Sequence, residues 1–232
     1  MLNDELSTFL KSQGADLIGF ADLREIPPGV RDNFPFGLSV AVALDPQIIS
    51  GIEDGPNLPY FEEYKRANHL LGTLGNGAAR FLEQRGYKAG SFAATNAGID
   101  PQILSTRLPH KTVATRAGLG WIGKCALLVT REFGSAIRLT TVLTDADFIT
   151  GESVNISQCG DCTSCADICP GHAVSGRDWQ VGMPRESLYD VVACRETADD
   201  FEKSRKVVHD SICGMCIAAC PWTKSYLKRA GK

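Results

Sequence analysis

The chain has 232 residues, of which 44% are apolar and 22% charged, and a formal net charge of −3. This size allows one large domain, or a domain with a small module, around a substantial core. No stretch approaches the roughly 20 consecutive apolar residues that cross a bilayer. The acidic, amphipathic start also lacks the basic-then-apolar layout of a secretory signal. We therefore expect a cytoplasmic protein without a membrane partner.

The first quarter of the chain predicts one helix and two strands. Residues 3–13 form an amphipathic helical pattern that Gly14 ends. Strands are expected at 16–21 and at 37–44, where the apolar residues first alternate and then run together. Residues 46–58 are rich in proline and glycine, which predicts an irregular loop.

The longest helical pattern comes next, at 60–85, where apolar residues recur every three or four positions. A strand is expected at 88–94 and a short helix at 109–117. Residues 125–130 and 136–144 both have strand-like patterns, and the five residues between them include a glycine, which predicts a hairpin. Together these elements predict an α+β domain.

The cysteines are concentrated in the last third, where eight of the nine lie between Cys159 and Cys220. Disulfides fit a cytosolic chain poorly, so the crowding indicates metal. The run from Cys159 to Cys169 has spacings of two, two and three residues and ends before a proline. This is the bacterial ferredoxin pattern for a [4Fe–4S] cluster, whereas zinc sites use pairs of cysteines. A second run ends at Cys220, again before a proline, and Cys194 lies alone upstream.

Eight thiolates are enough for two cubane clusters. In two-cluster ferredoxins the fourth cysteine of a run ligates the other cluster, which divides the eight into two sets. The first, the Cys159 set, is Cys159, Cys162, Cys165 and Cys220. The second, the Cys169 set, is Cys169, Cys194, Cys213 and Cys216. We therefore expect an α+β domain over residues 1–150 and a two-[4Fe–4S] ferredoxin-like module over 151–232. The ninth cysteine, Cys125, lies in an apolar run that predicts a buried strand and an inert thiol.

Residues 118–123, Gly-Leu-Gly-Trp-Ile-Gly, match the G-x-G-x-x-G pattern letter for letter. A dinucleotide fingerprint needs a strand before it and a helix after it, and here the order is reversed. We expect instead that the glycines allow a tight turn and a close approach to a cofactor.

Basic residues gather around this segment. Six lie between Arg107 and Arg138, with Glu132 as the single acid. Such a run indicates either a solvated face or a site for an anionic ligand. The expected cofactor contacts are Lys111, Arg116, Gly118, Gly120, Trp121, Gly123, Lys124 and Arg138. Of the four histidines, His110 is the one beside this segment, and we predict that it transfers protons.

The run from His110 to Lys124, followed by Gly134-Ser135 and the two cysteine runs, resembles the epoxyqueuosine reductase family over about residues 105–224. That family and the related reductive dehalogenases are similar in joining a cobalamin-binding α+β domain to a two-[4Fe–4S] ferredoxin module. The resemblance implies a nitroreductase-like, cobalamin-binding type of α+β domain here. It implies cobalamin as the cofactor of this domain, with FMN as the alternative.

Two features depart from that family. Residues 105–111 hold no acid where the family has its proton-donating aspartate. The chain also ends eleven residues after Pro221, where the family continues into a helical-repeat region that holds tRNA. There is no basic excess for a polyanionic partner either. We therefore expect a short relative that does not bind nucleic acid.

These observations predict an iron–sulfur oxidoreductase that passes single electrons through two [4Fe–4S] clusters to a base-off cobalamin, for reduction of a small substrate. Two alternatives stay open. One is an electron-transfer or activase protein that reduces a partner corrinoid protein. The other is a relative with FMN in the same pocket. The expected partner is a low-potential electron donor such as a ferredoxin or flavodoxin.

Overall fold

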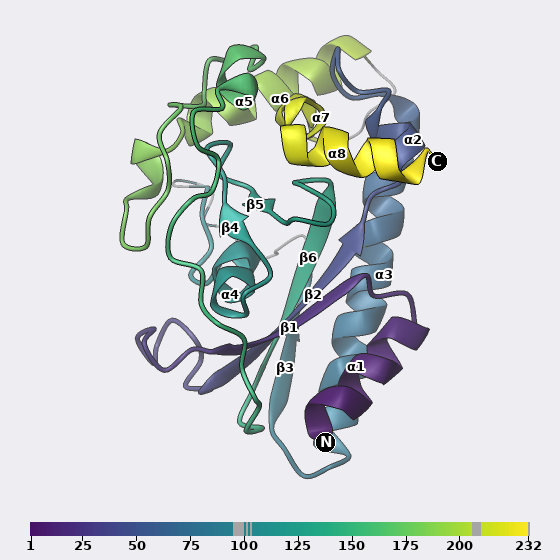
Figure 1. Ribbon diagram of the computed structural model, residues 1–232, viewed down its shortest axis with the longest axis vertical. Helices are drawn as coiled ribbons and strands as arrows, with labels where there is room; N and C mark the ends of the chain where they lie inside the picture. Colours follow the sequence, from purple (N-terminus) through teal and green to yellow (C-terminus); the bar gives the residue numbers. More distant parts are fainter. Residues whose placement is uncertain (95–99, 101, 103, 206–209, 232) are drawn as a thin grey trace. The chain divides into compact units, whose positions relative to one another are not determined.

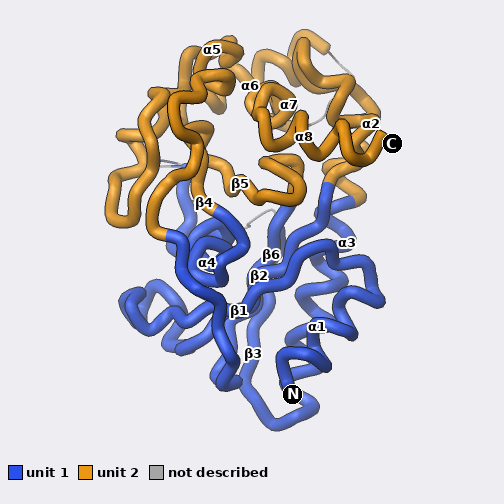
Figure 2. Tube along the Cα trace, viewed as in Figure 1, with its two compact units in different colours: residues 1–43, 67–120, 138–154 blue, residues 44–66, 121–137, 155–232 orange. Residues whose placement is uncertain are grey.

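The computed structural model describes the chain except residues 95–99, 101, 103, 206–209 and 232. The chain folds into two compact units that interleave along the sequence (Figure 2). Unit 1 consists of residues 1–43, 67–120 and 138–154, and unit 2 of residues 44–66, 121–137 and 155–232. Residues 121–137 therefore belong to the same unit as the cysteine-rich residues 155–232. From the sequence, they are expected in the first domain. A domain boundary at residue 150 stays a prediction.

A four-stranded sheet forms the centre of unit 1. In sheet order its strands are β1 (Leu17–Asp22), β2 (Phe36–Ala43), β6 (Ile137–Thr144) and β3 (Ala89–Phe92). β1 runs antiparallel to β2, and β3 runs antiparallel to β6. β2 is buried along nearly its whole length, as expected of a continuous apolar run in an inner strand.

Helices cover both faces of this sheet (Figure 1). α1 (Leu2–Ser12) and α3 (Leu58–Glu83) lie on one side and α4 (His110–Arg116) on the other. A Cβ atom on Gly75 would lie 3.4 Å from side-chain atoms of both Ser91 and Thr140, so α3 packs directly against β3 and β6 here. On the opposite face, Val113 and Ala117 pack with Ala21, Leu23 and Leu143 in a buried cluster.

Unit 2 is made of short elements. Its sheet pairs β4 (Trp121–Ile122) with β5 (Leu128–Val129). Its helices are α2 (Pro46–Ile49), α5 (Ser164–Asp167), the 3-10 helix η1 (Arg185–Ser187), α6 (Val191–Arg205), α7 (Met215–Ala219) and α8 (Pro221–Ala230), with the first residues of α3. Ile122 and Ala126 pack against Trp179 and Leu188, which ties the small sheet to the cysteine-rich part.

The predicted α+β class is confirmed, and so are the helices and strands expected before residue 118, to within a few residues. The expected loop at 46–58 is wrong at its start, because α2 forms there. The Asp45 carboxylate accepts hydrogen bonds from the backbone N–H groups of Gln47 and Ile48, and Pro46 is the first helical residue. Both are helix-start signals. No helix in the described ranges is long and apolar enough to cross a membrane.

The predicted hairpin of 125–130 with 136–144 is also wrong. β5 pairs with β4, and β6 belongs to the sheet of unit 1. The reason is a turn inside the apolar run, where Gly123 N–H donates to the Leu127 carbonyl and Ala126 adopts a φ of 60°. This turn folds β4 onto β5 and leaves only two residues for each strand.

Candidate functional site

Four predicted cluster ligands from two distant segments of the chain line one cavity of unit 2. Its volume is about 100 Å³. The lining residues are Lys124, Cys125, Val129, Cys159, Cys162, Cys165, Cys220, Pro221 and Trp222. The structure thus brings the whole Cys159 set together. No three Cys, His, Asp or Glu side chains of the described residues converge as ligands of a single metal ion would. The four thiols instead line the wall of a space, and thiolate sulfur is the donor that [4Fe–4S] clusters use.

Local backbone structure positions these thiols. Cys162 N–H donates to the Cys159 carbonyl, and α5 then carries Cys165 into the buried interior. Cys220 lies between α7 and α8 and caps α8, with Pro221 as the first helical residue. Burial raises the pKa of Cys220, while the backbone N–H groups of Trp222 and Thr223 at the start of α8 act in the opposite direction. Such N–H groups also stabilise a thiolate.

The Cys169 set is brought together in part. Cys194 lies on α6, and although the residue is exposed, its thiol lies near those of Cys169 and Cys213. Desolvation, followed by the charges of these two neighbours, raises the pKa of the Cys194 thiol. Cys169 Sγ also accepts a hydrogen bond of 3.3 Å from Ala173 N–H. Cys216 lies on α7, and its thiol interacts with that of Cys125.

Cys125 does not lie in a strand, contrary to the sequence prediction. It lies in the turn between β4 and β5. Its thiol is a fifth sulfur in the cavity of the Cys159 set, within hydrogen-bonding range of the Cys165 and Cys216 thiols. The sequence does not predict this turn, because the apolar residues that follow Cys125 give a stronger strand signal than Gly123 gives for a turn.

Three of the predicted cofactor contacts surround the same cysteines. Trp121 is fully buried, and its indole Nε1–H donates to Cys159 Sγ at 3.4 Å. The buried Lys124 donates from Nζ to the Gly160 carbonyl at 2.7 Å. A Cβ atom on Gly123 would lie 3.5 Å from Cys159 Sγ. The glycine-rich segment therefore approaches the cysteine-lined cavity.

The remaining predicted contacts lie in unit 1, where several serve its own fold. Arg116 is buried and donates from Nη2 to the Val154 carbonyl at 2.6 Å, and its burial lowers its pKa. Arg138 donates from Nε to Asn68 Oδ1 at 3.0 Å. Gly118 has a φ of 75°, and a Cβ atom there would lie 2.7 Å from the Glu152 carbonyl oxygen. The turn at Gly118 therefore packs against backbone. Lys111 is half-buried on α4, and Gly120, which follows α4 in the chain, is buried.

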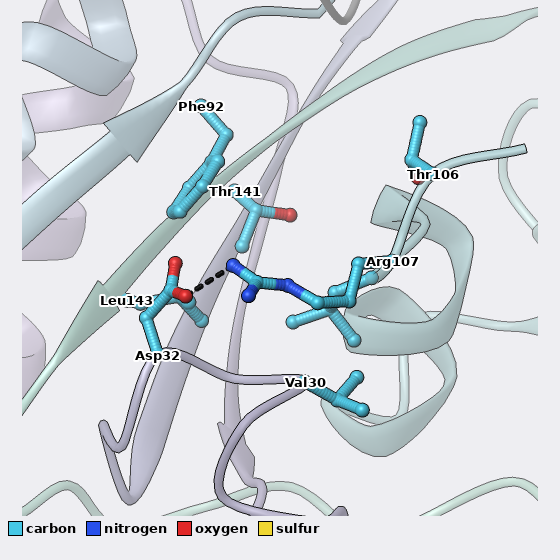
Figure 3. A pocket seen from close by; sticks show the side chains of 8 residues that line it. Val30, Asp32, Phe92, Thr106, Arg107, Thr141 and Leu143 are labelled. Atoms are coloured by element: carbon cyan, nitrogen blue, oxygen red, sulfur yellow. Dashed lines mark hydrogen bonds and ion pairs between the residues drawn. The ribbon is translucent and has the colours of Figure 1, made fainter. Parts of the chain in front are cut away.

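A second cavity, of about 250 Å³, lies in unit 1 (Figure 3). It is lined by Val30, Asp32, Phe92, Thr106, Arg107, Leu108, Thr141 and Leu143. Arg107 and Asp32 form an ion pair across it. Asp32 and Asn33 have φ values of 50° and 65°, in the left-handed region that Asp and Asn adopt more readily than other L-residues.

His110 stands behind this cavity and not in it. Its Nε2 lies 2.9 Å from the Ala93 carbonyl oxygen. Because a carbonyl only accepts, Nε2 carries the proton. Nδ1, 2.8 Å from Thr141 Oγ1, therefore accepts the threonine hydroxyl. Burial lowers the pKa of His110, which favours this neutral form. Thr141 lines the cavity, so His110 reaches the pocket only through that hydroxyl.

Comparisons with known proteins support cluster binding by the thiol-lined site. Residues 158–223 match the family model described as a 4Fe-4S double cluster binding domain. These residues include all eight cysteines of the two sets. The fold and the site therefore define an iron–sulfur protein with a double [4Fe–4S] cluster-binding domain.

Curated proteins of similar sequence point to one group of enzymes within this class of iron–sulfur proteins. The chain is 29% identical over 170 residues to the epoxyqueuosine reductase of Lactococcus garvieae, covering 72% of this chain and 47% of the relative. It spans about half the length of such curated relatives. The chain is thus related to the epoxyqueuosine reductases, as the sequence predicts.

Two solved structures share the fold. A reductive dehalogenase, described with a mechanism for B12-dependent dehalogenation, matches with a TM-score of 0.73 and 17% identity, over 97% of this chain and 33% of its own. Epoxyqueuosine reductase from Streptococcus thermophilus matches with a TM-score of 0.60 and 20% identity, over 96% of this chain and 66% of its own. Both relatives are oxidoreductases.

Proposed function

We propose that this protein is an iron–sulfur reductase that passes single electrons through two [4Fe–4S] clusters to a corrinoid bound by unit 1, for reduction of a small molecule. The observation that carries this proposal is the cavity lined by the Cys159 set. The fold shared with a dehalogenase described as B12-dependent supports the corrinoid. A bound corrinoid would supply the reductive bond chemistry.

Each cysteine set has its own part in the proposal. The Cys159 set holds one cluster, and the Cys169 set holds the other. Since Cys194 is the exposed member of the eight, a low-potential donor such as a ferredoxin or flavodoxin reduces the module through the Cys169 cluster. Trp121, Gly123 and Lys124 belong to the cluster site in this proposal and are not corrinoid contacts.

The cavity of unit 1 suits the small substrate. Its volume of about 250 Å³ lies just below the range of roughly 300–1,000 Å³ that holds drug-sized ligands. Phe92, Leu108 and Leu143 offer an apolar wall. Arg107 is paired with Asp32, but its guanidinium has five N–H donors, more than that one carboxylate accepts. We therefore favour a small molecule with an apolar body and an acidic group. The Thr141 hydroxyl, which donates to His110 Nδ1, lines this cavity and can accept a hydrogen bond from such a molecule.

The visible spectrum of the anaerobically reconstituted protein, recorded with and without cobalamin, tests this function. A base-off cobalamin spectrum supports the proposal. Tight binding of FMN in place of cobalamin would favour a flavin-containing relative. If neither binds, the remaining function is electron transfer to a partner corrinoid protein. An iron content below about six atoms per chain, where two cubanes need about eight, would overturn the cluster assignment.

A further inference from the structure

The segment Trp121–Cys125 contributes four of its five residues to the surroundings of the Cys159 set. Trp121 is 1% exposed and donates to Cys159 Sγ. Lys124 and Cys125 line the cavity itself. These contacts all lie within unit 2.

We propose that the Trp121–Cys125 segment is a built part of this cluster site, and that Trp121 and Lys124 raise the reduction potential of the cluster held by the Cys159 set. The inference rests on the cluster assignment proposed above. It gives the glycine-rich segment a role that its pattern alone does not suggest, namely control of an electron-transfer centre.

The Trp121 hydrogen bond acts on the charge of the reduced cluster. Reduction adds one electron to the cluster, and no bond forms or breaks. The added negative charge spreads to the sulfurs, so an N–H donor to Cys159 Sγ stabilises the reduced form more than the oxidised form. Because Trp121 is buried, water does not compete for its indole N–H, and the low local dielectric strengthens the effect.

Lys124 acts in the same direction through its charge. A lysine this deeply buried needs a counter-charge. Asp178 compensates the charge of Lys124 only in part, because its Oδ1 lies 4.0 Å from Nζ and its side chain is 53% exposed. An oxidised cluster with four thiolates carries about −2 by formal valence and would complete the compensation. Reduction makes the cluster more negative, so the neighbouring cation favours it.

Gly123 is what allows the segment to lie this close. A Cβ atom there would lie 2.7 Å from Val129 Cγ2, 3.5 Å from Cys159 Sγ and 3.6 Å from Cys125 Sγ. A side chain at this position would have to displace a strand residue and enter the space beside the sulfurs. The third glycine of the pattern therefore serves the close packing against Val129 of β5, which keeps the segment beside the sulfurs.

The test is an EPR-monitored redox titration of the reconstituted holoprotein and three variants. In Trp121→Phe we expect the reduction equilibrium of one cluster to fall about tenfold, which is about 59 mV for a one-electron couple. Lys124→Gln keeps an N–H donor for the Gly160 carbonyl and loses the charge, so the same potential should fall. The matched control is Trp222→Phe, because Trp222 lines the same cavity and packs edge-on against Trp121, with ring centroids 5.2 Å apart. It should lower the potential by clearly less than Trp121→Phe does.

The outcomes separate the inference from the proposed function. Wild-type protein with fewer than about six irons per chain would overturn the cluster assignment itself. Full iron content with equal potentials in Trp121→Phe and Trp222→Phe would overturn the inference alone. If Trp121→Phe loses its cluster, Trp222→Phe protein with isotopically labelled indole nitrogen gives a second measurement. The reduced cluster should then show a nitrogen coupling from the labelled indole, and its absence would contradict the hydrogen bond.

Discussion

Replacing Gly118 with alanine tests whether this turn is packed against backbone or open to a ligand. An L-residue at a φ of 75° costs roughly 1 kcal/mol. The new Cβ would also lie 2.7 Å from the Glu152 carbonyl oxygen, and overpacking of this kind costs about 1–3 kcal/mol. We expect a total loss of about 3 kcal/mol, which lowers the Tm by roughly 6–12 °C at this chain length.

Gly86→Ala is the matched control, since Gly86 has a φ of 87° with nothing within 4 Å of its Cβ position. It carries the backbone cost alone, so its Tm should fall by roughly 2–4 °C. Thermal unfolding followed by circular dichroism, on samples with equal iron content, measures both variants. Equal losses in the two would refute the reasoning, because the Glu152 contact would then contribute nothing. The turn would be free to hold a cofactor, as the sequence predicted.

Further predictions concern the rest of unit 1 and α2. The pKa of His110 lies below its ordinary value of 6.5, so its contribution to stability is complete above that pH and is lost as pH falls through the native pKa. Urea unfolding between acid and neutral pH should show this slope in wild type, and His110→Gln should flatten it. Asp45→Ala removes the cap of α2 and should cost about 1 kcal/mol in the same assay, whereas Asp45→Asn should cost less. Arg107→Gln should weaken binding of phenylacetate, a probe for the cavity of unit 1, about tenfold by calorimetry. Equal affinity for phenylacetate and its neutral amide in wild type would contradict a role for Arg107.

The sequence predicts most of unit 1 because its elements are long and their burial is periodic. α3 repeats its apolar residues over many turns, and β2 is a continuous apolar run. The cysteine sets can be predicted equally well from the sequence, because cluster ligation imposes fixed spacings on its ligands. These are local signals, and each survives in the folded chain.

What the sequence could not predict depends on contacts between distant residues. The turn at Cys125 looks like a strand because its neighbours are apolar, and only its packing against the cysteines shows otherwise. Trp121 and Lys124 look like contacts for an anionic cofactor, yet their partners are Cys159 and the Gly160 carbonyl. Charge and glycine content indicate that something is approached closely, but not what is approached.

The central claim is that two separate thiolate sets hold two clusters. Iron analysis with EPR of the reduced wild-type protein, Cys220→Ala and Cys194→Ala tests it most directly. The account predicts about eight irons in wild type and about four in each variant, with a different cluster signal remaining in each. Loss of the same signal in both variants, or full iron content in Cys220→Ala, would contradict the assignment.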